Sequence, residues 1–417
     1  MTSAPHVVDL TALLNRARLA QRQLPSGPRE AGLNAVAAAL RADARTILEA
    51  NALDVAAEID AGTPAPLVDR LRLDEERLEA VAAACEQVAA LPDPLHRVAR
   101  GWRLEAGLDV REVTVPFGVV GMIYESRPNV TVDAAALAIK AGSAAVLRGS
   151  ASALRSNRAL VAAMRRGLVG AGLPADAVQL IDSPERRYVT ELLSARGRVD
   201  LVIPRGGASL ITHVVETAKV PVIETGVGNC HVYVHSDADL ASAAAIVRNA
   251  KVQRPGVCNA AETLLVDVEV AAAFLPRVAD ALRAEGVRLR GCERARAVVE
   301  MEPAGDDDWA EEYLDLILAV RVVDGVDDAI EHIDRWGSGH SEAIVTASRE
   351  AARTFQERVD AAAVYVNAST RFTDGFVFGF GAEIGISTQK LHARGPMGLE
   401  HLVTRKYLVD GDGQVRG

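Results

Sequence analysis

Two spacings of apolar residues divide the chain, and each predicts a different kind of element. Over the first hundred residues the apolar positions recur at helical intervals, as Leu33, Val36 and Leu40 do. Asp74 is expected to cap a second helix, whose buried face includes Cys85. This part of the chain is therefore predicted to be helical.

Beyond residue 110 the spacing changes, and short apolar runs alternate with helical stretches. Val113 and Val115 alternate with polar residues, which predicts a half-exposed strand that Pro116 ends. The later runs are apolar throughout, as the buried strands of parallel sheets are. They cover residues 118–125, 144–150, 199–207, 221–226, 231–235, 262–268, 342–348 and 362–367. Helices are expected over residues 132–142, 154–172 and 207–218, and after Pro184.

Strands that alternate with helices predict an α/β fold in which parallel sheets are covered on both faces. We expect two doubly wound, Rossmann-like domains and a small β element, in which the alternating tail at 402–410 pairs with the strand near 111–116. The exposed edges of such an element could pair across subunits, so we expect a homo-oligomer.

Composition and charge narrow the class of protein. Of the 417 residues, 49% are apolar and 24% are charged, as in ordinary folded proteins. No apolar stretch reaches the length of a membrane span, and Asp9 interrupts the N-terminal apolar run, which does not resemble a signal peptide. The net charge of −10 argues against a nucleic acid or an anionic membrane as partner. We therefore expect a cytoplasmic protein that acts on a small molecule.

One of the four cysteines has surroundings that suit chemistry. No two of them have C-x-x-C spacing, so neither a zinc site nor any other metal site is expected. Cys258 follows the turn signal Arg254-Pro255-Gly256, and the rare Lys251 adds a second cation. Positive charge lowers the pKa of a thiol. A nucleophile and a buried loop cysteine remain equally open at this point, because no histidine is an evident base for Cys258.

Nucleotide fingerprints of the common kinds are absent. The chain has neither G-x-G-x-x-G after a strand nor a P-loop. Three glycine-bearing segments do follow apolar runs, at 148–150, 204–207 and 224–229. Glycine lets a backbone approach a phosphate, although most such glycines only form turns. Arg148, Arg205 and the acidic Glu224 in these segments favour a ligand site.

Longer motifs resemble a known family. Glu224-Thr225-Gly226 followed by Cys258 resembles the Glu-x-Gly and nucleophilic cysteine of the aldehyde dehydrogenase superfamily. Within it, the γ-glutamyl phosphate reductases are the most similar, and the resemblance runs almost end to end. It is carried by residues 115–142, 199–207, 224–234, 249–266 and 392–402.

The resemblance implies NADPH-dependent reduction of L-glutamyl 5-phosphate to L-glutamate 5-semialdehyde and phosphate, the second step of proline biosynthesis from glutamate. Cys258 would attack the acyl phosphate and form a thioester. Lys251 and Arg254 would bind the phosphoryl group, and Arg127 and Arg371 are further candidates for the phosphate or the α-carboxylate.

The expected oxyanion donors differ from those of the wider superfamily. Where typical members have Pro-Trp-Asn, this chain has Tyr124-Glu125-Ser126. We expect the backbone N–H of Cys258 to stabilise the oxyanion, with Ser126 or Asn259. Glu224 matches the base of hydrolytic relatives, but activating water would waste the thioester, so it is expected to orient the cofactor or cap a turn.

The resemblance also implies the cofactor residues. Arg148 and Gly149 would lie at the adenosine ribose, where an arginine suits the 2′-phosphate of NADPH. Glu312 would bind the nicotinamide ribose. The pyrophosphate would pass Pro204, Arg205, Gly206 and Gly207.

The implied domain organisation has three parts. An NADP-binding domain is expected over 1–103 and 117–228, and a catalytic domain with the cysteine over 229–395. An oligomerisation element would use 104–116 and 396–417. We expect a homodimer or homotetramer, and functional coupling with glutamate kinase.

Three alternatives remain open from the residues alone. Another acylating aldehyde dehydrogenase, dependent on CoA or phosphate, would share the fold but would give no reason for the pair Lys251 and Arg254. A cysteine hydrolase or amidotransferase would need a histidine on Cys258. A structural protein with this fold would not need an intact cysteine loop.

Overall fold

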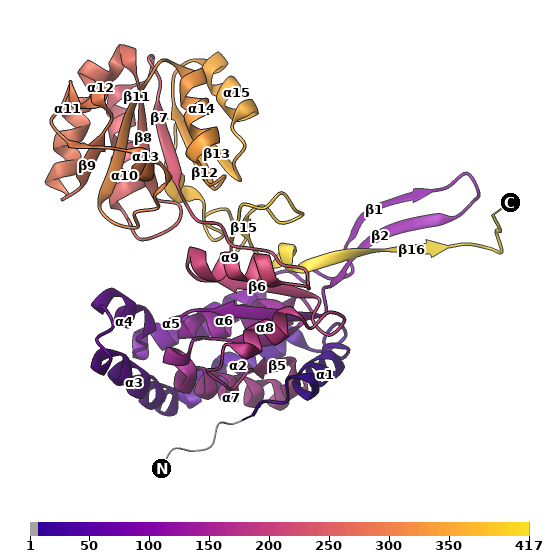
Figure 1. The fold of residues 1–417 in the computed structure, drawn as a ribbon. Helices are drawn as coiled ribbons and strands as arrows, with labels where there is room; N and C mark the ends of the chain where they lie inside the picture. The colour runs from indigo at the N-terminus through magenta and orange to yellow at the C-terminus, as the bar shows by residue number, and fades with distance from the viewer. Residues whose placement is uncertain (1–6, 417) are drawn as a thin grey trace. The chain divides into compact units, whose positions relative to one another are not determined.

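A computed structural model describes residues 7–416 and divides them into two compact units (Figure 1). The first unit contains the residues up to Glu224, Phe380–Gly385 and the residues from Met397 onward. The second unit contains Thr225–Gly379 and Ile386–Pro396. No helix among residues 7–416 has both the length and the apolar character needed to cross a bilayer.

The first unit is built on a parallel sheet of four strands in the order β5-β4-β3-β6. The strands are β3 (Val119–Tyr124), β4 (Ala144–Arg148), β5 (Val178–Leu180) and β6 (Leu201–Arg205). Every residue of β3 and β4 is buried. This explains why both strands are apolar throughout, since each strand packs against helices on both of its faces.

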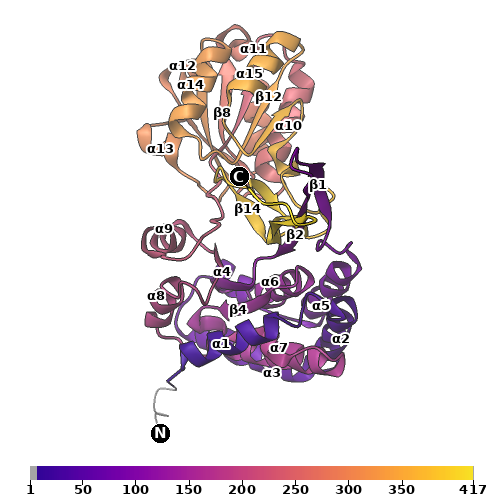
Figure 2. The same ribbon diagram turned by 90° about the vertical axis from the view of Figure 1, so that its right-hand side faces the viewer.

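Helices cover both faces of this sheet (Figure 2). α1, α8 and α9 pack on the face formed by Val119 and Ile123. The rest of the unit contains α6 and α7, on which α2, α3 and α5 pack. The helices are α1 (Leu10–Gln21), α2 (Arg29–Ala42), α3 (Ala44–Asp60), α4 (Ala65–Leu71), α5 (Glu75–Ala90), α6 (Pro128–Lys140), α7 (Leu154–Gly170), α8 (Arg187–Leu193) and α9 (Ala208–Thr217), with 3-10 turns η1 (Ala151–Ala153), η2 (Ala175–Ala177) and η4 (Leu399–Leu402).

Three antiparallel strands form a ribbon that belongs to the first unit. They are β1 (Val98–Arg103), β2 (Asp109–Pro116) and β16 (Val403–Asp410), and β2 lies in the middle. The expected pairing of the C-terminal tail with the strand near 111–116 is confirmed, because β16 runs antiparallel to β2 from Val403 opposite Pro116 to Asp410 opposite Asp109. β1 is a third strand that the expected boundary at residue 103 did not assign to this element.

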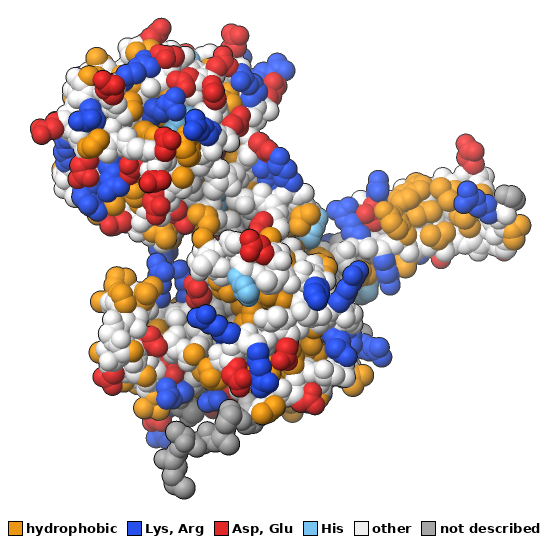
Figure 3. Space-filling model, in the orientation of Figure 1, with side chains coloured by type: hydrophobic (Ala, Val, Ile, Leu, Met, Phe, Trp, Pro, Cys, Tyr) orange, Lys and Arg blue, Asp and Glu red, His pale blue; other side chains and the backbone are white. Residues whose placement is uncertain are grey.

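Apolar side chains lie exposed along the ribbon (Figure 3). Trp102 packs edge-on against Tyr407 with ring centroids 6.1 Å apart, and Tyr407 remains 56% exposed. Val98, Leu104 and Val409 are exposed as well. β1 and β16 are the outer strands of this sheet, so the ribbon presents two sheet edges and an apolar surface.

The second unit is built on a seven-stranded sheet in the order β10-β9-β11-β8-β7-β12-β13, with all its pairs parallel. α10, α11 and α12 cover one face, and α14 and α15 cover the other. The strands are β7 (Cys230–Val234), β8 (Ala261–Asp267), β9 (Arg288–Gly291), β10 (Glu302–Pro303), β11 (Ile317–Val323), β12 (Ser341–Val345) and β13 (Ala363–Val366). The helices are α10 (Leu240–Val252), α11 (Val268–Ala284), α12 (Glu293–Arg296), α13 (Asp306–Ala310), α14 (Val326–Trp336), α15 (Arg349–Arg358) and the 3-10 turn η3 (Thr370–Phe372), while β14 (Gly385–Ser387) and β15 (Gly395–Met397) form a separate two-stranded sheet.

The α/β class, the parallel sheets and the N-terminal helices agree with the sequence, and so does the cap on α5, where Asp74 accepts from Arg77 N–H. Cys85 is buried as expected. The strand predicted over 221–226 is wrong. Only Val222 pairs, in a single parallel bridge to Val202, because Pro221 has no N–H to continue the ladder.

The packing of α7 on α2 leaves no room at one glycine, and this gives a test of the first unit. A Cβ on Gly167 would lie 2.7 Å from the backbone of Val36, whereas a Cβ on Gly170 in the same helix would meet nothing within 4 Å. We expect Gly167→Ala to destabilise the protein by about 1–3 kcal/mol through overpacking. Gly170→Ala should be neutral or stabilise it by up to about 1 kcal/mol, because alanine favours helix. Urea unfolding followed by circular dichroism measures both, and equal midpoints for the two variants would contradict this packing.

Candidate active site

Cys258 lies in a loop at the amino ends of the strands of the second unit. The nucleophile loop, residues 253–260, connects the end of α10 to the start of β8, and Cys258 is half-buried. Cys230 opens β7 opposite Ala261, which opens β8. The loop position expected for Cys258 is therefore confirmed.

The backbone of Gly228 lies directly against the nucleophile loop. A Cβ on Gly228 would lie 1.5 Å from the carbonyl oxygen of Cys258 and 2.5 Å from its Cα. The N–H of Gly228 donates to Glu312 Oε1 at 2.8 Å. Burial raises the pKa of Glu312, and the hydrogen bond from Gly228 opposes that rise. Only glycine fits at position 228 without moving the loop.

A second buried thiol supports the same carbonyl. Cys230 Sγ donates to the carbonyl oxygen of Cys258 at 3.2 Å and lies 3.7 Å from His340 Nδ1. Burial raises the pKa of the Cys230 thiol well above its ordinary value, so Cys230 stays protonated and can donate. This agrees with the expectation that Cys230 is structural.

Two arginines belong to the surroundings of Cys258, because Arg254 stands four residues before it in the nucleophile loop and Arg371 interacts electrostatically with both Arg254 and Cys258. Burial lowers the pKa of Arg371, the charge of Arg254 lowers it further, and Cys258 acts in the opposite direction. Arg371 Nε also donates to Gln253 Oε1 at 2.7 Å, which ties Arg371 to the nucleophile loop. The structure therefore brings together three predicted residues from two distant segments, and Arg254 is exposed.

Asn259 is used differently from the prediction. Its side-chain Nδ2 donates to the backbone carbonyl of Thr373 at 2.8 Å and to that of Arg371 at 3.4 Å. The backbone carbonyl of Asn259 accepts from Thr370 Oγ1 at 2.7 Å. The side chain is only 4% exposed. Because the amide donors of Asn259 are bonded to this segment, they hold Arg371 beside the loop and do not reach toward an oxyanion.

Lys251 is also placed differently from the prediction. It is fully buried, and its Nζ donates to Glu262 Oε2 at 2.6 Å. Burial lowers the pKa of Lys251, and burial raises the pKa of Glu262 to about 7. An ammonium group in this position is not available to a substrate phosphate, because it is fully buried and paired with Glu262.

In the first unit, three serines form a cluster where β3 and β4 end. Ser126 Oγ lies 2.6 Å from Ser152 Oγ and 3.2 Å from Ser150 Oγ. Arg127 follows Ser126 and is the exposed N-cap residue of α6. The Ser126 hydroxyl is thus engaged with its neighbours, and its proposed oxyanion role is untested.

Arg148 ends β4 and interacts electrostatically with a second arginine, Arg186. Its guanidinium donates to the carbonyls of Gly149 at 3.0 Å and Pro184 at 3.1 Å, and its Nε has no partner within the described chain. Burial lowers the pKa of Arg148, and the charge of Arg186 lowers it further. Across residues 7–416, neither arginine has a carboxylate within ion-pair distance. Two adjacent cations of this kind suit a phosphate ester.

The glycines expected at the pyrophosphate have other contacts. The N–H of Gly207 donates to Glu125 Oε2 at 3.0 Å, and a Cβ on Gly206 would lie 2.7 Å from the Glu125 carboxyl carbon. An anion therefore already lies at the start of α9. Pro204 and Arg205 belong to β6. A Cβ on Gly149 would meet Asn157 Nδ2 at 2.2 Å, so Gly149 is required for packing.

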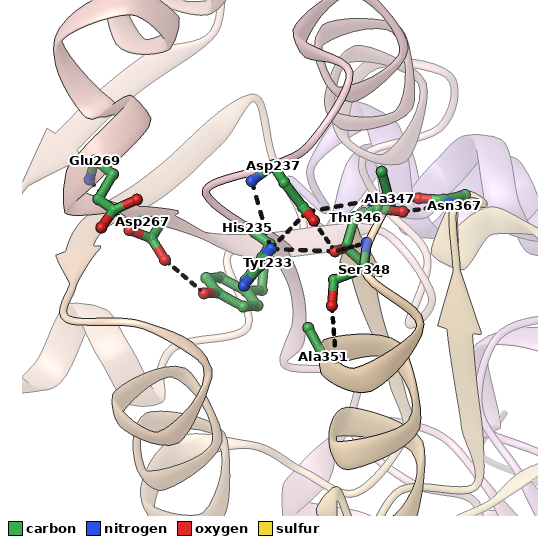
Figure 4. Close-up of polar contacts among 10 residues, drawn as sticks. All are labelled: Tyr233, His235, Asp237, Asp267, Glu269, Thr346, Ala347, Ser348, Ala351 and Asn367. Atoms are coloured by element: carbon green, nitrogen blue, oxygen red, sulfur yellow. Dashed lines mark hydrogen bonds and ion pairs between the residues drawn. The ribbon is translucent and has the colours of Figure 1, made fainter.

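The carboxyl ends of the strands in the second unit are closed by side chains (Figure 4). Tyr233 OH donates to Asp267 Oδ2 at 2.9 Å, and Thr346 Oγ1 donates to Asp237 Oδ1 at 2.7 Å. Burial opposes ionisation of Asp237, but hydrogen bonds from Thr346 and His235 lower its pKa to about 2. Asn367 joins β13 to the backbone of Thr346. This edge is therefore filled, and the nucleophile loop occupies the opposite edge.

Three functional contacts were not predicted from the sequence. Gly228, Arg186 and Glu262 carry no motif of their own, because glycine, arginine and glutamate are common. Only Gly228 could have been identified from the sequence, since it lies in the glycine-bearing segment 224–229. That segment was expected to follow a strand, but it leads into β7.

Comparisons with known proteins agree with this geometry. Residues 6–288 match the aldehyde dehydrogenase family. The γ-glutamyl phosphate reductase of Moorella thermoacetica is 56% identical over 405 residues, which cover 96% of this chain and 97% of that protein. The protein of the same name from Symbiobacterium thermophilum is 56% identical over 98% of this chain and 100% of its own length. The crystal structure of γ-glutamyl phosphate reductase from Thermotoga maritima has a TM-score of 0.97 and 48% identity, and covers 98% of this chain and 100% of that chain.

The contact between Gly228 and the nucleophile loop gives a test with a matched glycine. A Cβ on Gly256 would meet only Leu314 O at 3.6 Å, an ordinary contact. We expect Gly228→Ala to displace the loop, to lower stability by about 1–3 kcal/mol and to change the rate at which iodoacetamide alkylates Cys258. Gly256→Ala should change neither. Thermal unfolding and mass spectrometry of the alkylated cysteine measure these effects, and a Gly228→Ala protein that behaves as wild type would rule out the close contact.

Proposed function

The chain belongs to the aldehyde dehydrogenase family, and on this premise we propose that it reduces L-glutamyl 5-phosphate to L-glutamate 5-semialdehyde and phosphate in proline biosynthesis. One observation carries the proposal from the site itself. Cys258 is a half-buried loop cysteine that interacts electrostatically with Arg371, which in turn interacts with Arg254 of the same loop.

Two adjacent guanidiniums suit an acyl phosphate better than an unactivated aldehyde. Each can donate two hydrogen bonds to a phosphoryl group, and together they neutralise its two negative charges. They also favour the thiolate form of Cys258. A thioester of CoA or a simple aldehyde would give no reason for two cations at this position, so the site favours the phosphate substrate. Arg127 remains a candidate for the α-carboxylate.

The reaction follows from these groups. The Cys258 thiolate attacks the acyl carbon, and the bond from that carbon to the phosphate oxygen breaks, so that phosphate leaves with the bonding electrons and a thioester remains. Arg254 and Arg371 stabilise the charge on the leaving phosphate. The backbone N–H of Cys258 would stabilise the oxyanion, and the aldehyde is released when the carbon–sulfur bond breaks and the thiolate is restored.

The family and the reductase names imply a nicotinamide cofactor, and we propose NADPH. When bound, the cofactor supplies the hydride that reduces the thioester. Arg148 and Arg186 fit the 2′-phosphate that distinguishes NADPH from NADH, because they are adjacent cations without a carboxylate partner in the part of the chain described. Glu224 and Glu312 stay predictions for the cofactor, and no base role is proposed for Glu224.

The proposal extends to the roles of the two units, the assembly and the location of the protein. The first unit would bind the cofactor, the second unit would carry the chemistry, and the ribbon would join subunits into a homodimer or homotetramer through its exposed edges. We further propose a cytoplasmic location and functional coupling with glutamate kinase.

The proposed reaction can be measured in reverse, because the acyl phosphate is unstable. With glutamate semialdehyde and NADP⁺, the wild-type enzyme should produce NADPH only when inorganic phosphate is present. Cys258→Ala should lower this rate by at least about a thousandfold, because the nucleophile is lost. Cys292→Ser is the control, since Cys292 Sγ accepts from the N–H groups of Ala295, in α12, and Val322, and the serine hydroxyl is also an acceptor.

Two outcomes of this assay would contradict the proposal. Phosphate-independent NADPH formation would indicate a hydrolytic dehydrogenase and would return Glu224 to the role of base. Formation that requires CoA in place of phosphate would indicate a CoA-dependent acylating enzyme.

The cofactor proposal is tested at two neighbouring arginines. Arg186→Gln should raise KM for NADPH by about tenfold and leave KM for NADH unchanged, because a charge-assisted hydrogen bond to the 2′-phosphate contributes about 1.5–3 kcal/mol. Arg187→Gln is the matched control, because Arg187 pairs with Glu185 and packs over the Tyr188 ring. Equal effects on NADPH and NADH would show that Arg186 does not read the phosphate.

A further inference from the structure

The ion pair between Lys251 and Glu262 takes part in no step of the proposed reaction, yet it closes the nucleophile loop. Lys251 precedes the loop on α10, and Glu262 follows it on β8. Neither side chain is exposed, and the two atoms are 2.6 Å apart. Removing two charges from water costs several kcal/mol per ion, which their attraction repays only in part. Apolar residues of similar volume would close the loop without this desolvation free energy. The stability of the fold alone therefore does not explain why an ion pair is found here.

Glu262 uses its other oxygen on a segment distant in sequence. The N–H of Leu314 donates to Glu262 Oε1 at 3.3 Å. Leu314 has φ of +52°, in the left-handed region that residues with a side chain rarely adopt. That conformation costs about 1–2 kcal/mol, and the hydrogen bond to Glu262 is one of the contacts that maintain it.

The segment that Glu262 fixes lies against the nucleophile loop. The carbonyl of Leu314 is the atom that a Cβ on Gly256 would meet. Glu312, two residues earlier, accepts the N–H of Gly228, whose backbone touches the carbonyl of Cys258. One carboxylate therefore contacts both Lys251, at the start of the loop, and the segment that supports its middle.

We propose that Lys251 and Glu262 are positioning residues, which hold the Cys258 thiol in place by closing the two ends of the nucleophile loop and by fixing Leu314 beside it. The inference rests on the proposed role of Cys258 as the nucleophile. It assigns Lys251 to the support of the loop and not to the substrate phosphate.

Two double variants that differ in one hydrogen-bond acceptor test the proposal. Lys251→Met with Glu262→Leu removes both charges and the acceptor of the Leu314 N–H. Lys251→Met with Glu262→Gln removes both charges but keeps an amide oxygen at that position. Replacement of a buried ion pair by apolar residues is often neutral or stabilising, so the Met/Leu protein should fold. The folding of the Met/Gln protein is checked by its circular dichroism spectrum before its rates are compared. Val278→Ala, a core substitution in α11, is the control for loss of stability alone.

We expect the Met/Leu protein to lose at least about tenfold in kcat while KM for the semialdehyde changes by less than about threefold, because a misplaced nucleophile affects the chemical step. Alkylation of Cys258 by iodoacetamide should slow as well, since the displaced thiol leaves the guanidiniums that favour its thiolate. The Met/Gln protein should recover most of both rates. Val278→Ala should lower the unfolding temperature and leave both rates unchanged.

Two results would overturn the proposal: a Met/Leu protein with wild-type kcat and alkylation rate, or a Met/Gln protein as impaired as Met/Leu. If Met/Leu does not fold, Glu262→Asp carries the same test, because the shorter carboxylate cannot reach both Lys251 and Leu314. It should slow alkylation of Cys258, and a wild-type rate would refute the role. Alkylation needs no substrate, so this comparison stands even if the wild-type enzyme fails to oxidise the semialdehyde.

Discussion

The contact between the backbone of Gly228 and the carbonyl of Cys258 is the constraint on which the arrangement of the second unit depends. The two segments lead into neighbouring strands, β7 and β8, so their contact determines where the nucleophile loop leaves the sheet. The two backbone groups that meet there each have a protein partner. Cys230 donates to the carbonyl of Cys258, and Glu312 accepts the N–H of Gly228. Because these contacts hold the nucleophile loop through its backbone, the side chain of Cys258 is not needed to fix the loop.

Charge is distributed unevenly around this loop. The protein has a net charge of −10, so its overall field does not attract an anionic substrate. Many arginines are paired with carboxylates, as Arg294 is with Asp324. Arg254 and Arg371 have no such pair within residues 7–416, and Arg371 interacts electrostatically with Cys258. Positive charge is therefore available where the proposed phosphoryl group would bind, because pairing cancels much of it elsewhere.

The sequence predicted those features that follow from periodicity or from a rare motif. Buried parallel strands are apolar throughout, so β3, β4 and β8 could be located, and the Arg-Pro-Gly turn placed Cys258 in a loop. Side-chain partners could not be predicted in this way. Lys251 was predicted to be a phosphate ligand because it lies seven residues before Cys258 in the sequence. Its partner Glu262 could not be identified, because a polar residue near the start of a strand is common. Arg186 had no signal, because only the fold brings it to Arg148.

The proposed sites of the two units lie at opposite edges of their parallel sheets. The difference arises because side chains close the carboxyl edge in the second unit only. In the first unit, the strands β3, β4 and β6 end at Tyr124, Arg148 and Arg205, with helices beginning shortly after. This is the edge where α/β sheets usually bind ligands. In the second unit the same edge is closed by hydrogen bonds such as Tyr233 to Asp267 and Thr346 to Asp237 (Figure 4). With its carboxyl edge filled, the second unit carries Cys258, the proposed nucleophile, at the amino edge, where no rule of strand order predicts a site. Within the described residues, no helix begins directly after the carboxyl end of a strand at this edge, so the loop that carries Cys258 has to be held by side chains, and the hydrogen bonds of Glu262 to Lys251 and Leu314 suit that role in our proposal.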